Sequence, residues 1–306
     1  MTESGLIAEA GEPANARLYA IVARAARRAV IFRRGPTKRV RLLTWDLATD
    51  QIGAGQWFKG RIYERRCDLS PSGDMLVYFA ASFRRPYYSW TAVSRPPFFT
   101  ALALWPKGDC WGGGGLFETD RKLCLNHSLH QFALADGFTL PPGFQVEPLG
   151  AHSGGGEDQA ILWQRRLRDG WIQLPAEVDA RRKGRGKRWY IDPPLTVQKS
   201  SDGRSPHDLL LRQHPPGTDE TRGRWHVETA DLASPDGCIV LELGRLDWAD
   251  LDHNGDVIYA QDGRLFRLPK PTARQDSGQL RPRLVADLND MEFEPIKPPD
   301  WAQRWD

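Results

Sequence analysis

One stretch of the sequence carries oxygen-bearing side chains at alternating positions around a glycine. In "DLDHNGD" these side chains are Asp250, Asp252, Asn254 and Asp256. Such a set suits a hard cation such as Ca²⁺, but an EF-hand loop also needs a bidentate glutamate at its twelfth position. Counted from Asp250, that position is Gln261, and it is followed by the hairpin signal Asp262-Gly263. We therefore predict a tight turn between two strands and no metal site.

A second group of residues has the side chains that dominate binding energy in protein interfaces. The segment "SFRRPYYSWTAVSRPPFF", residues 82–99, combines six aromatic side chains with three arginines. Tyrosine, tryptophan and arginine are enriched in binding hot spots. We predict an inserted loop that binds a protein partner, and its expected contact residues are Arg84, Arg85, Tyr87, Tyr88, Trp90 and Arg95. The alternative is that the loop folds back over sheet edges or plugs a central channel.

The densest positive charge lies in "ARRKGRGKRW", residues 180–189. Its basic residues are Arg181, Arg182, Lys183, Arg185, Lys187 and Arg188. Two glycines add flexibility, and Trp189 could stack on a base, so this loop is a candidate for binding a nucleic acid or another polyanion. The alternative is a solvated loop between structural units.

No set of residues matches a catalytic motif. The run "WGGGGLF" lacks the lysine and Ser/Thr of a P-loop, so we interpret it as a turn or a close backbone approach. Cys124, His127 and His130 could bind a metal, but their spacing matches no closed zinc site. If the protein were a hydrolase or lyase, Asp247 and Asp250 could hold a metal in a channel. We expect no cofactor and no catalytic residue.

The composition indicates a globular protein. Apolar residues make up 40% of the 306 residues, which is enough for a sizeable core. The 29 glycines and 23 prolines are spread along the chain, as expected for short strands joined by tight turns. The net charge of +3 is small, so anion binding would depend on local clusters. No signal peptide, long apolar run or C-x-x-C pair is found, and we expect a cytoplasmic protein with reduced thiols and no membrane contact.

The turn after Asp250 belongs to a degenerate repeat. "DLSPSGDMLVYFA" from Asp68 and "DLDHNGDVIYA" from Asp250 share Asp-Leu, three turn residues, Gly-Asp and a β-run that contains Tyr and ends in Ala. A third copy, "DLASPDGCIVLEL" from Asp231, shares Asp-Leu and a Ser-Pro-Asp-Gly turn. In "LLTWDLATD" a predicted strand ends in Trp-Asp before a polar turn. Each copy predicts a turn that leads into a strand.

This repeat resembles the blades of β-propellers of the WD-repeat and TolB type, in which a Ser-Pro-Asp-Gly turn links the innermost strand to the second. The resemblance implies an all-β fold with four strands in each blade. The last blade is the clearest, because "LDWADLD", "DVIYA", "RLFRL" and "RPRLVADL" form four successive predicted strands. We expect five blades, with six as the alternative. They form one domain, residues 14–295, between a flexible N-terminus, 1–13, and a C-terminal tail, 296–306.

Two segments bear on the details of this prediction. "RLYAIVARAARRAV", residues 17–30, could be strand or helix, because its apolar residues also fit helical spacing. "AILWQRRL", residues 160–167, is expected to be a strand. We predict a non-catalytic propeller that binds a protein partner through its aromatic and arginine-rich loop, with its oligomeric state open. The alternatives are a metal-assisted hydrolase or lyase and a nucleic-acid or polyanion binder.

Overall fold

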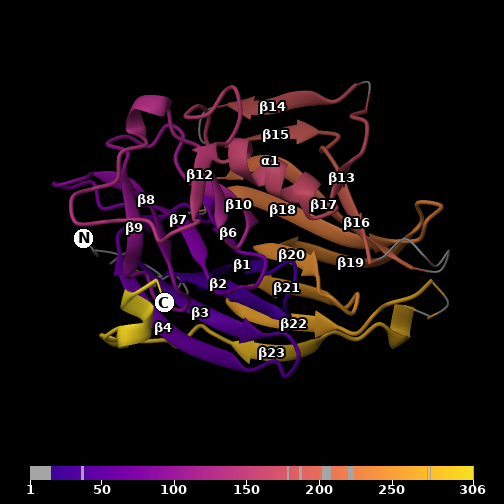
Figure 1. The fold of residues 1–306 in the computed structure, drawn as a ribbon. Coiled ribbons are helices and arrows are strands. Elements are labelled where there is room, and N and C mark those ends of the chain that lie inside the picture. Colours follow the sequence, from indigo (N-terminus) through magenta and orange to yellow (C-terminus); the bar gives the residue numbers. More distant parts are fainter. Residues whose placement is uncertain are drawn as a thin grey trace, which may run out of the picture.

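The computed structural model describes residues 15–35, 38–177, 179–185, 188–201, 208–219, 224–273, 275 and 277–305. In this part of the chain the strands form five sheets, and α1 (Gln159–Arg168) is the one α-helix. Figure 1 shows α1 in the upper half of a molecule built otherwise from strands, loops and short 3₁₀ helices. The prediction of an all-β fold without long helices is confirmed.

The first sheet contains four antiparallel strands in chain order. They are β1 (Arg17–Val22), β2 (Arg28–Arg34), β3 (Arg39–Asp46) and β4 (Ile52–Lys59). Consecutive residues in the middle of β1, β2 and β3 are buried, so both faces of these strands are covered. A surface helix would instead bury one stripe of its residues. The strand prediction for residues 17–30 is confirmed and the helical alternative is wrong.

The second sheet contains β5 (Arg61–Ile62), β6 (Asp68–Leu69), β7 (Leu76–Ala81), β8 (Ser89–Ser94) and β9 (Ala101–Pro106). β5 and β6 both pair with β7, and the 3₁₀ helix η1 (Glu64–Arg66) separates them. The prediction of a single loop over residues 82–99 is wrong, because β8 lies within it. The β8 sequence "SWTAVS" is rich in β-formers and is almost entirely buried, which favours a central strand.

The third sheet is small. β10 (Gly115–Thr119) and β11 (Lys122–Leu125) form a hairpin, the 3₁₀ helix η2 (Leu129–Gln131) follows, and β12 (Gln145–Pro148) pairs with β11 in parallel. The glycine run lies just before β10. Gly113 has a φ of 83°, and a Cβ there would lie 2.4 Å from the ring of Phe79. The close backbone approach predicted for this run is confirmed.

The helix α1 follows the third sheet at the position where the sequence predicts a strand. Its buried residues are Ile161, Leu162 and Arg165, a spacing that fits one face of a helix. Gly170, with a φ of 87°, follows the end of the helix in the left-handed conformation that commonly terminates helices. The strand prediction is wrong because a short apolar run fits either element and tertiary contacts decide between them.

The fourth sheet has seven strands. They are β13 (Ile172–Gln173), β14 (Arg181–Arg185), β15 (Arg188–Asp192), β16 (Val197–Ser200), β17 (Leu210–Asp219), β18 (Arg224–Ala233) and β19 (Ile239–Leu246). β17 pairs with β16 and β15 along one edge and with β18 along the other. This sheet is therefore larger than a four-stranded unit.

The fifth sheet matches its prediction closely. β20 (Trp248–Leu251), β21 (Val257–Gln261), β22 (Arg264–Leu268) and β23 (Arg283–Asp287) are antiparallel neighbours in chain order. Asp262 and Gly263 form the two-residue turn between β21 and β22, and both have positive φ. The four successive strands predicted for this region are confirmed.

The repeated turn has the same backbone hydrogen bonds in its three copies. The amide of the turn glycine donates to the carbonyl of the residue three positions earlier. These pairs are Gly73 to Ser70 at 2.9 Å, Gly237 to Ser234 at 2.8 Å and Gly255 to Asp252 at 3.0 Å. The three glycines have φ of 81°, 93° and 81°, a region that other residues rarely enter. The sequence repeat is thus also a structural repeat of strand, turn and strand.

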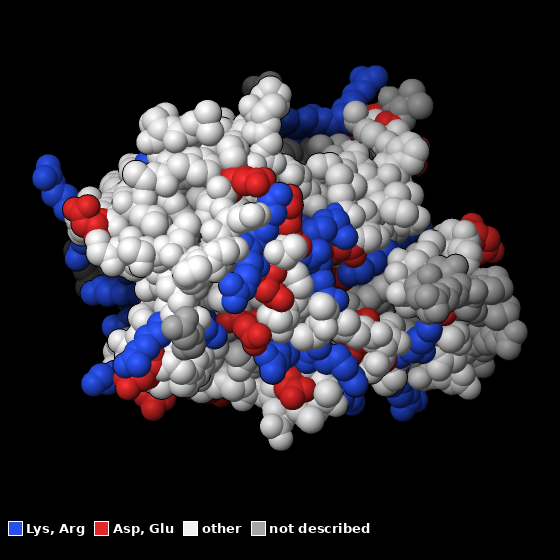
Figure 2. Space-filling model, viewed as in Figure 1, with Lys and Arg blue, Asp and Glu red and all other residues white. Residues whose placement is uncertain are grey.

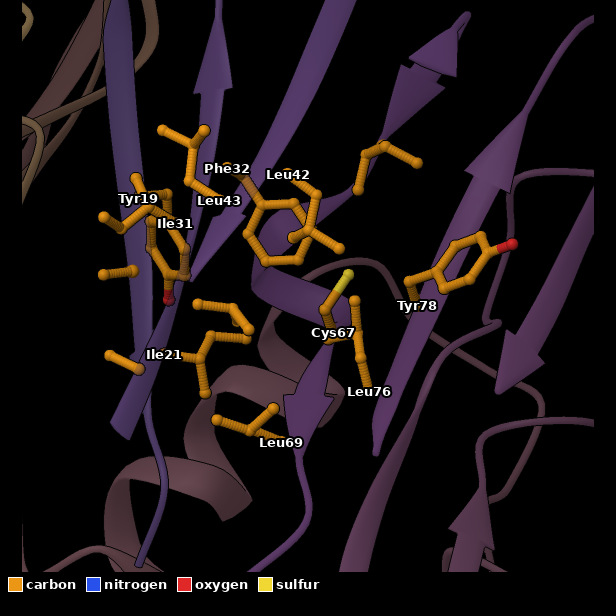
Figure 3. Packing of buried hydrophobic residues seen from close by; sticks show 14 of the residues in the cluster. Tyr19, Ile21, Ile31, Phe32, Leu42, Leu43, Cys67, Leu69, Leu76 and Tyr78 are labelled. Carbon is orange, nitrogen blue, oxygen red and sulfur yellow. The ribbon is translucent and has the colours of Figure 1, made fainter. Parts of the chain in front are cut away.

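A few strands of each sheet contact those of the neighbouring sheets. β1 contacts β6 of the second sheet and both β20 and β21 of the fifth, β10 contacts β6 and β7, and β17 contacts β20. α1 contacts β10 and η1. The largest hydrophobic core lies between the first, second and fifth sheets, and Figure 3 shows side chains of β1, β2 and β3 facing those of β6 and β7. Further cores lie between the second and third sheets and between the fourth and fifth.

After β23 the chain returns across the other sheets. Three aromatic pairs attach it, with centroid distances of 6.1, 5.4 and 5.1 Å: Trp57 with Phe293, Phe98 with Trp301, and Phe144 with Trp305. The 3₁₀ helix η5 (Asp300–Gln303) carries the second of these contacts. The described part of the C-terminal segment therefore packs on the sheets.

Candidate functional site

The turn between β7 and β8 presents two large aromatic side chains to solvent. Phe83 and Tyr88 are 48% and 43% exposed, and their ring centroids lie 5.3 Å apart in an edge-to-face arrangement. Arg84 and Arg85, between them in sequence, are exposed as well. We call Phe83, Arg84, Arg85 and Tyr88 the tip surface. It contains three of the six contact residues expected from the sequence, Arg84, Arg85 and Tyr88.

The backbone of this turn is strained at both rings. Phe83 has a φ of 57° and Tyr88 a φ of 61°, in the left-handed region. Such a conformation costs a non-glycine residue about 1–3 kcal/mol. The amides of Ser82 and Phe83 both donate to the carbonyl of Tyr88 at 3.0 Å, and the amide of Tyr88 donates to the carbonyl of Arg84 at 2.8 Å. The exposed rings thus belong to a turn that is hydrogen-bonded on both sides.

The other three expected contact residues pack within the protein. Tyr87 lies half-buried against the main core, and Trp90 is a residue of β8 whose ring lies 5.8 Å from Phe58. Arg95 donates to the carbonyl oxygen of Arg304 at 3.0 Å and so holds the C-terminal segment. Tyr87, Trp90 and Arg95 are therefore engaged in packing and hydrogen bonds within the protein.

Further exposed apolar side chains lie beside the base of this hairpin. The amide of Lys107 donates to the carbonyl of Ser89 at 2.9 Å, which places the loop after β9 next to the start of β8. Trp111 in this loop is 59% exposed. The Gln131 side chain donates to the carbonyl of Lys107 at 3.2 Å and brings η2 to the same loop, where Leu129 is 77% exposed. Two more exposed apolar side chains therefore lie beside the base of the hairpin that carries the tip surface.

The basic segment is a hairpin of β14 and β15 rather than the predicted loop, because its two halves pair in antiparallel register. The guanidinium of Arg182 lies 4.5 Å from the ring centroid of Trp189, and Lys183 pairs with Asp192. Lys187 lies outside the described residues. Arg182 therefore covers one face of the ring that the sequence offered for stacking on a base.

An arginine faces the carboxylates of the turn that resembles a calcium loop. Arg267 of β22 is 3% exposed and pairs with Asp252, with Asp256 at 2.8 Å and with Asp50 of the first sheet at 2.7 Å. The hydrogen bonds from Arg267 raise its own pKa despite burial, which alone would lower it. The cationic partner of Asp252 and Asp256 is thus a residue of the protein itself.

Other contacts order the backbone of this turn or hold its first residue. One carboxylate oxygen of Asp252 accepts hydrogen bonds from the amides of Asn254 at 2.8 Å and Asp256 at 3.0 Å. This is the backbone-ordering role predicted from the sequence. The carboxylate of Asp250 lies 2.7 Å from the Lys199 ammonium, in a separate ion pair.

Arginines of η1 and α1 meet acidic residues where the first, second and fourth sheets come together. Arg65 pairs with Glu228 of β18 at 2.7 Å, and both residues are 5% exposed. Arg66 pairs with Asp158, just before α1, at 2.6 Å. The same carboxyl group lies 3.1 Å from Nε2 of His226. With Arg165 and Arg166 of α1, these residues form what we call the central polar network.

Arg165 and Arg166 have weaker anionic contacts than the arginines of η1. Arg165 is 5% exposed and donates to the hydroxyl of Tyr19 and to a backbone carbonyl. Arg166 donates to the Gln213 side chain at 2.7 Å and lies 3.7 Å from Glu228. Burial lowers the pKa of Arg166, although the charge of Glu228 opposes this shift. The network therefore holds more buried positive charge than its carboxylates neutralise.

The same charges shift the other titratable groups of the network. Burial alone would raise the pKa of Glu228, but Arg65 and Arg166 lower it to about 2. Burial, together with the charge of Arg65, lowers the pKa of His226. At neutral pH the carboxylate is ionised and the imidazole is neutral.

A pocket opens onto the network between β1, η1 and β18. Its cavity volume is about 70 Å³, and it is partly open to solvent. Its polar lining residues are Arg17, Tyr19, Arg34, Arg61, Tyr63, Glu64, Arg65, Asp158, His226, Glu228 and Asp247. Tyr19 and Glu228 also line a smaller pocket against α1 and β20. Figure 2 shows charged side chains of both signs gathered in the middle of the molecular face on which these elements lie.

The acids considered for a metal in a channel lie apart. Asp247 lines the larger pocket, whereas Asp250 lines the smaller one and pairs with Lys199. His127 is buried and its Nε2 lies 2.8 Å from the hydroxyl of Thr91. Within the described ranges, no group of three or more His, Cys, Asp or Glu side chains is placed to hold a metal ion.

The central polar network is absent from the site residues predicted from the sequence. Its signals were the basic runs "ERR" at 64–66 and "RRLR" at 165–168. The acids that meet them, Asp158 and Glu228, are ordinary residues in sequence, and Glu228 lies 163 positions from its partner Arg65. No local sequence motif predicts such a pair, because its two residues are far apart in sequence.

Comparisons with known proteins give no assignment: no protein-family model matches the chain, and no curated protein matches it. In the described parts of the chain, no helix is long and apolar enough to cross a membrane.

Proposed function

We propose that this chain binds a protein partner through the tip surface and performs no reaction there. The observation that carries the proposal is the pair Phe83 and Tyr88, both exposed on left-handed backbone. Backbone strain of this kind concentrates at functional sites. Each ring also leaves apolar area in water that a partner could bury, and aromatic side chains dominate interface energies.

The chemistry of the tip surface favours a partner with an apolar pocket and acidic neighbours. Arg84 and Arg85 lie between Phe83 and Tyr88 in sequence and are exposed. Their charge favours acidic groups on the partner and would increase the association rate more than the affinity. Trp111 and Leu129 offer further exposed apolar area beside the base of the same hairpin.

We also propose that the five sheets are blades of one degenerate β-propeller and that the protein is cytoplasmic. The repeated turn, the four-stranded first and fifth sheets, and the contacts of β1 with both β6 and β20 support the propeller. The second, third and fourth sheets, with five, three and seven strands, depart from four. Cys67, Cys110, Cys124 and Cys238 are all free thiols, which suits a reducing compartment.

The binding proposal is tested with the double variant Phe83→Asn/Tyr88→Asn. Asparagine tolerates left-handed backbone better than aromatic residues do, so the variant should fold at least as stably as the original chain. The matched control is Ile239→Thr/Leu284→Thr, which removes two apolar side chains of similar exposure, 54% and 52%, from other sheets. Proteins retained from a host lysate by the immobilised chains are compared by quantitative mass spectrometry.

The expected partner is retained by the original chain and the control variant but lost with the tip variant. With the purified partner, calorimetry should give an affinity at least about thirtyfold weaker for the tip variant, the scale of hot-spot residues. If the three chains retain the same proteins equally, the tip surface is not a binding site.

A further inference from the structure

We propose that the pocket between β1, η1 and β18 binds a small anionic molecule through a carboxylate or phosphate group. The pocket lies at the central polar network, apart from the tip surface, and the proposal does not rest on protein binding. The charges around the pocket favour an anionic ligand.

The cations of η1 and α1 outnumber the carboxylates that they contact. Five arginines, Arg65, Arg66, Arg165, Arg166 and Arg168, meet four acids, Asp68, Asp158, Asp169 and Glu228. Arg65 and Arg166 share Glu228, at 2.7 and 3.7 Å. Arg165 reaches only neutral oxygens among the described residues. His226 is uncharged near pH 7, so it counts neither among the cations nor among the anions.

A surplus of buried positive charge is unfavourable unless an anion compensates it. An ionised group loses most of its hydration when buried, and buried charges are therefore normally paired. Tyr19 and Glu228 form the wall between the pocket and the arginines of α1, so an anion in the pocket would lie close to this surplus. The hydroxyl of Tyr19 accepts from Arg165 and retains its own proton for donation to a ligand oxygen.

The mouth of the pocket supplies the groups that would recognise such a ligand. Arg61 lines it with its guanidinium 4.6 Å from the ring centroid of Tyr63, and it contacts no carboxylate among the described residues. Arg34 lies beside it, paired with Glu64 at 2.6 Å. A planar guanidinium donates two parallel hydrogen bonds to a carboxylate or phosphate, which makes arginine the usual residue for both groups.

The volume of the pocket limits the size of the ligand. A cavity of about 70 Å³, partly open to solvent, has room for one small anionic group such as a carboxylate or a phosphate, and the rest of a larger ligand would lie outside it. Carboxylates on the wall, Glu64, Asp158, Glu228 and Asp247, would repel a second or third negative charge placed beside them. We therefore expect the anionic group to enter at Arg61 and the remainder of the ligand to be neutral or cationic where it faces these acids.

The experiment measures binding of defined probes by isothermal titration calorimetry at constant ionic strength. The probes are inorganic phosphate, acetate, and acetamide as the uncharged analogue of acetate. The chains are the original protein, Arg61→Gln, and the control Arg281→Gln. Both arginines are exposed and lack a carboxylate contact among the described residues, so both variants should fold, which the thermal midpoint checks.

Saturable binding of phosphate or acetate to the original chain and to Arg281→Gln, weakened about tenfold or more in Arg61→Gln, supports the proposal. The tighter of the two anions identifies the group that the ligand carries. The proposal is overturned if neither anion gives saturable binding, if acetamide binds as well as acetate and phosphate gives no saturable binding, or if Arg61→Gln binds the anions as tightly as the original chain. None of these results depends on the tip surface.

Discussion

Replacement of Arg267 by methionine should destabilise the protein strongly. The guanidinium is almost fully buried and compensates three carboxylates, of which the Asp252 side chain is 0% exposed. Its removal leaves that carboxylate buried without a cation, and breaking a buried ion pair in this way costs about 3–5 kcal/mol. The variant also loses the ion pair with Asp50 at 2.7 Å, which connects the fifth sheet to the first.

Urea denaturation followed by tryptophan fluorescence measures this effect. With a slope of roughly 3 kcal/mol per molar for a chain of this size, the midpoint should fall by about 1 M or more. The matched control is Arg264→Met in the same strand, because Arg264 pairs with Asp287 at the surface and its loss should barely move the midpoint. Adding Asp252→Asn to Arg267→Met should recover part of the loss, since the buried group is then neutral. If Arg267→Met lowers the free energy of unfolding by less than about 1 kcal/mol, this explanation is wrong, because water would then already solvate the carboxylates.

Two further predictions concern the central polar network and the glycine run. Because the folded pKa of Glu228 is about 2 and its ordinary value is 4.5, its contribution is complete above pH 4.5 and is lost as the pH falls toward 2. The thermal midpoint should fall as the pH is lowered across this range, and it should fall less steeply with pH in Glu228→Gln. Equal dependence on pH in the two chains would contradict the lowered pKa of Glu228. Gly113→Ala should cost about 2 kcal/mol or more in urea denaturation, because a Cβ would meet the Phe79 ring at 2.4 Å on left-handed backbone. Gly108 has a similar φ, but a Cβ there would lie in open space, so Gly108→Ala should lose less stability and the difference measures the steric effect. Equal losses of stability in the two variants would contradict this explanation.

Local patterns predicted most of the strands and the tight turns. The turn glycines Gly73, Gly237 and Gly255 follow the same short pattern of turn residues, and all three adopt the left-handed conformation with the same hydrogen bond. The fifth sheet was predictable because each of its strands is bounded by turn residues close in sequence. Such features depend on a few consecutive residues, whose backbone preferences are physical properties of the residues themselves.

The segment 160–167 shows where local reasoning was insufficient. Its apolar residues fit either a strand or a helix, and burial of Ile161, Leu162 and Arg165 against distant parts of the chain favours the helix. The aromatic segment is a similar case. Its composition could not distinguish Tyr88, exposed at the turn, from Trp90, which packs within β8 against Phe58.

By itself, the sequence determined the all-β character, the repeated turn and the presence of arginines in unusual number near positions 65 and 165. Only the tertiary structure decided which of these arginines are buried and what they meet. Arg65 finds Glu228 and Arg267 finds Asp50 across 163 and 217 positions of the chain. The physical reason is that backbone preferences act between neighbours in sequence, whereas burial and charge pairing act between neighbours in space.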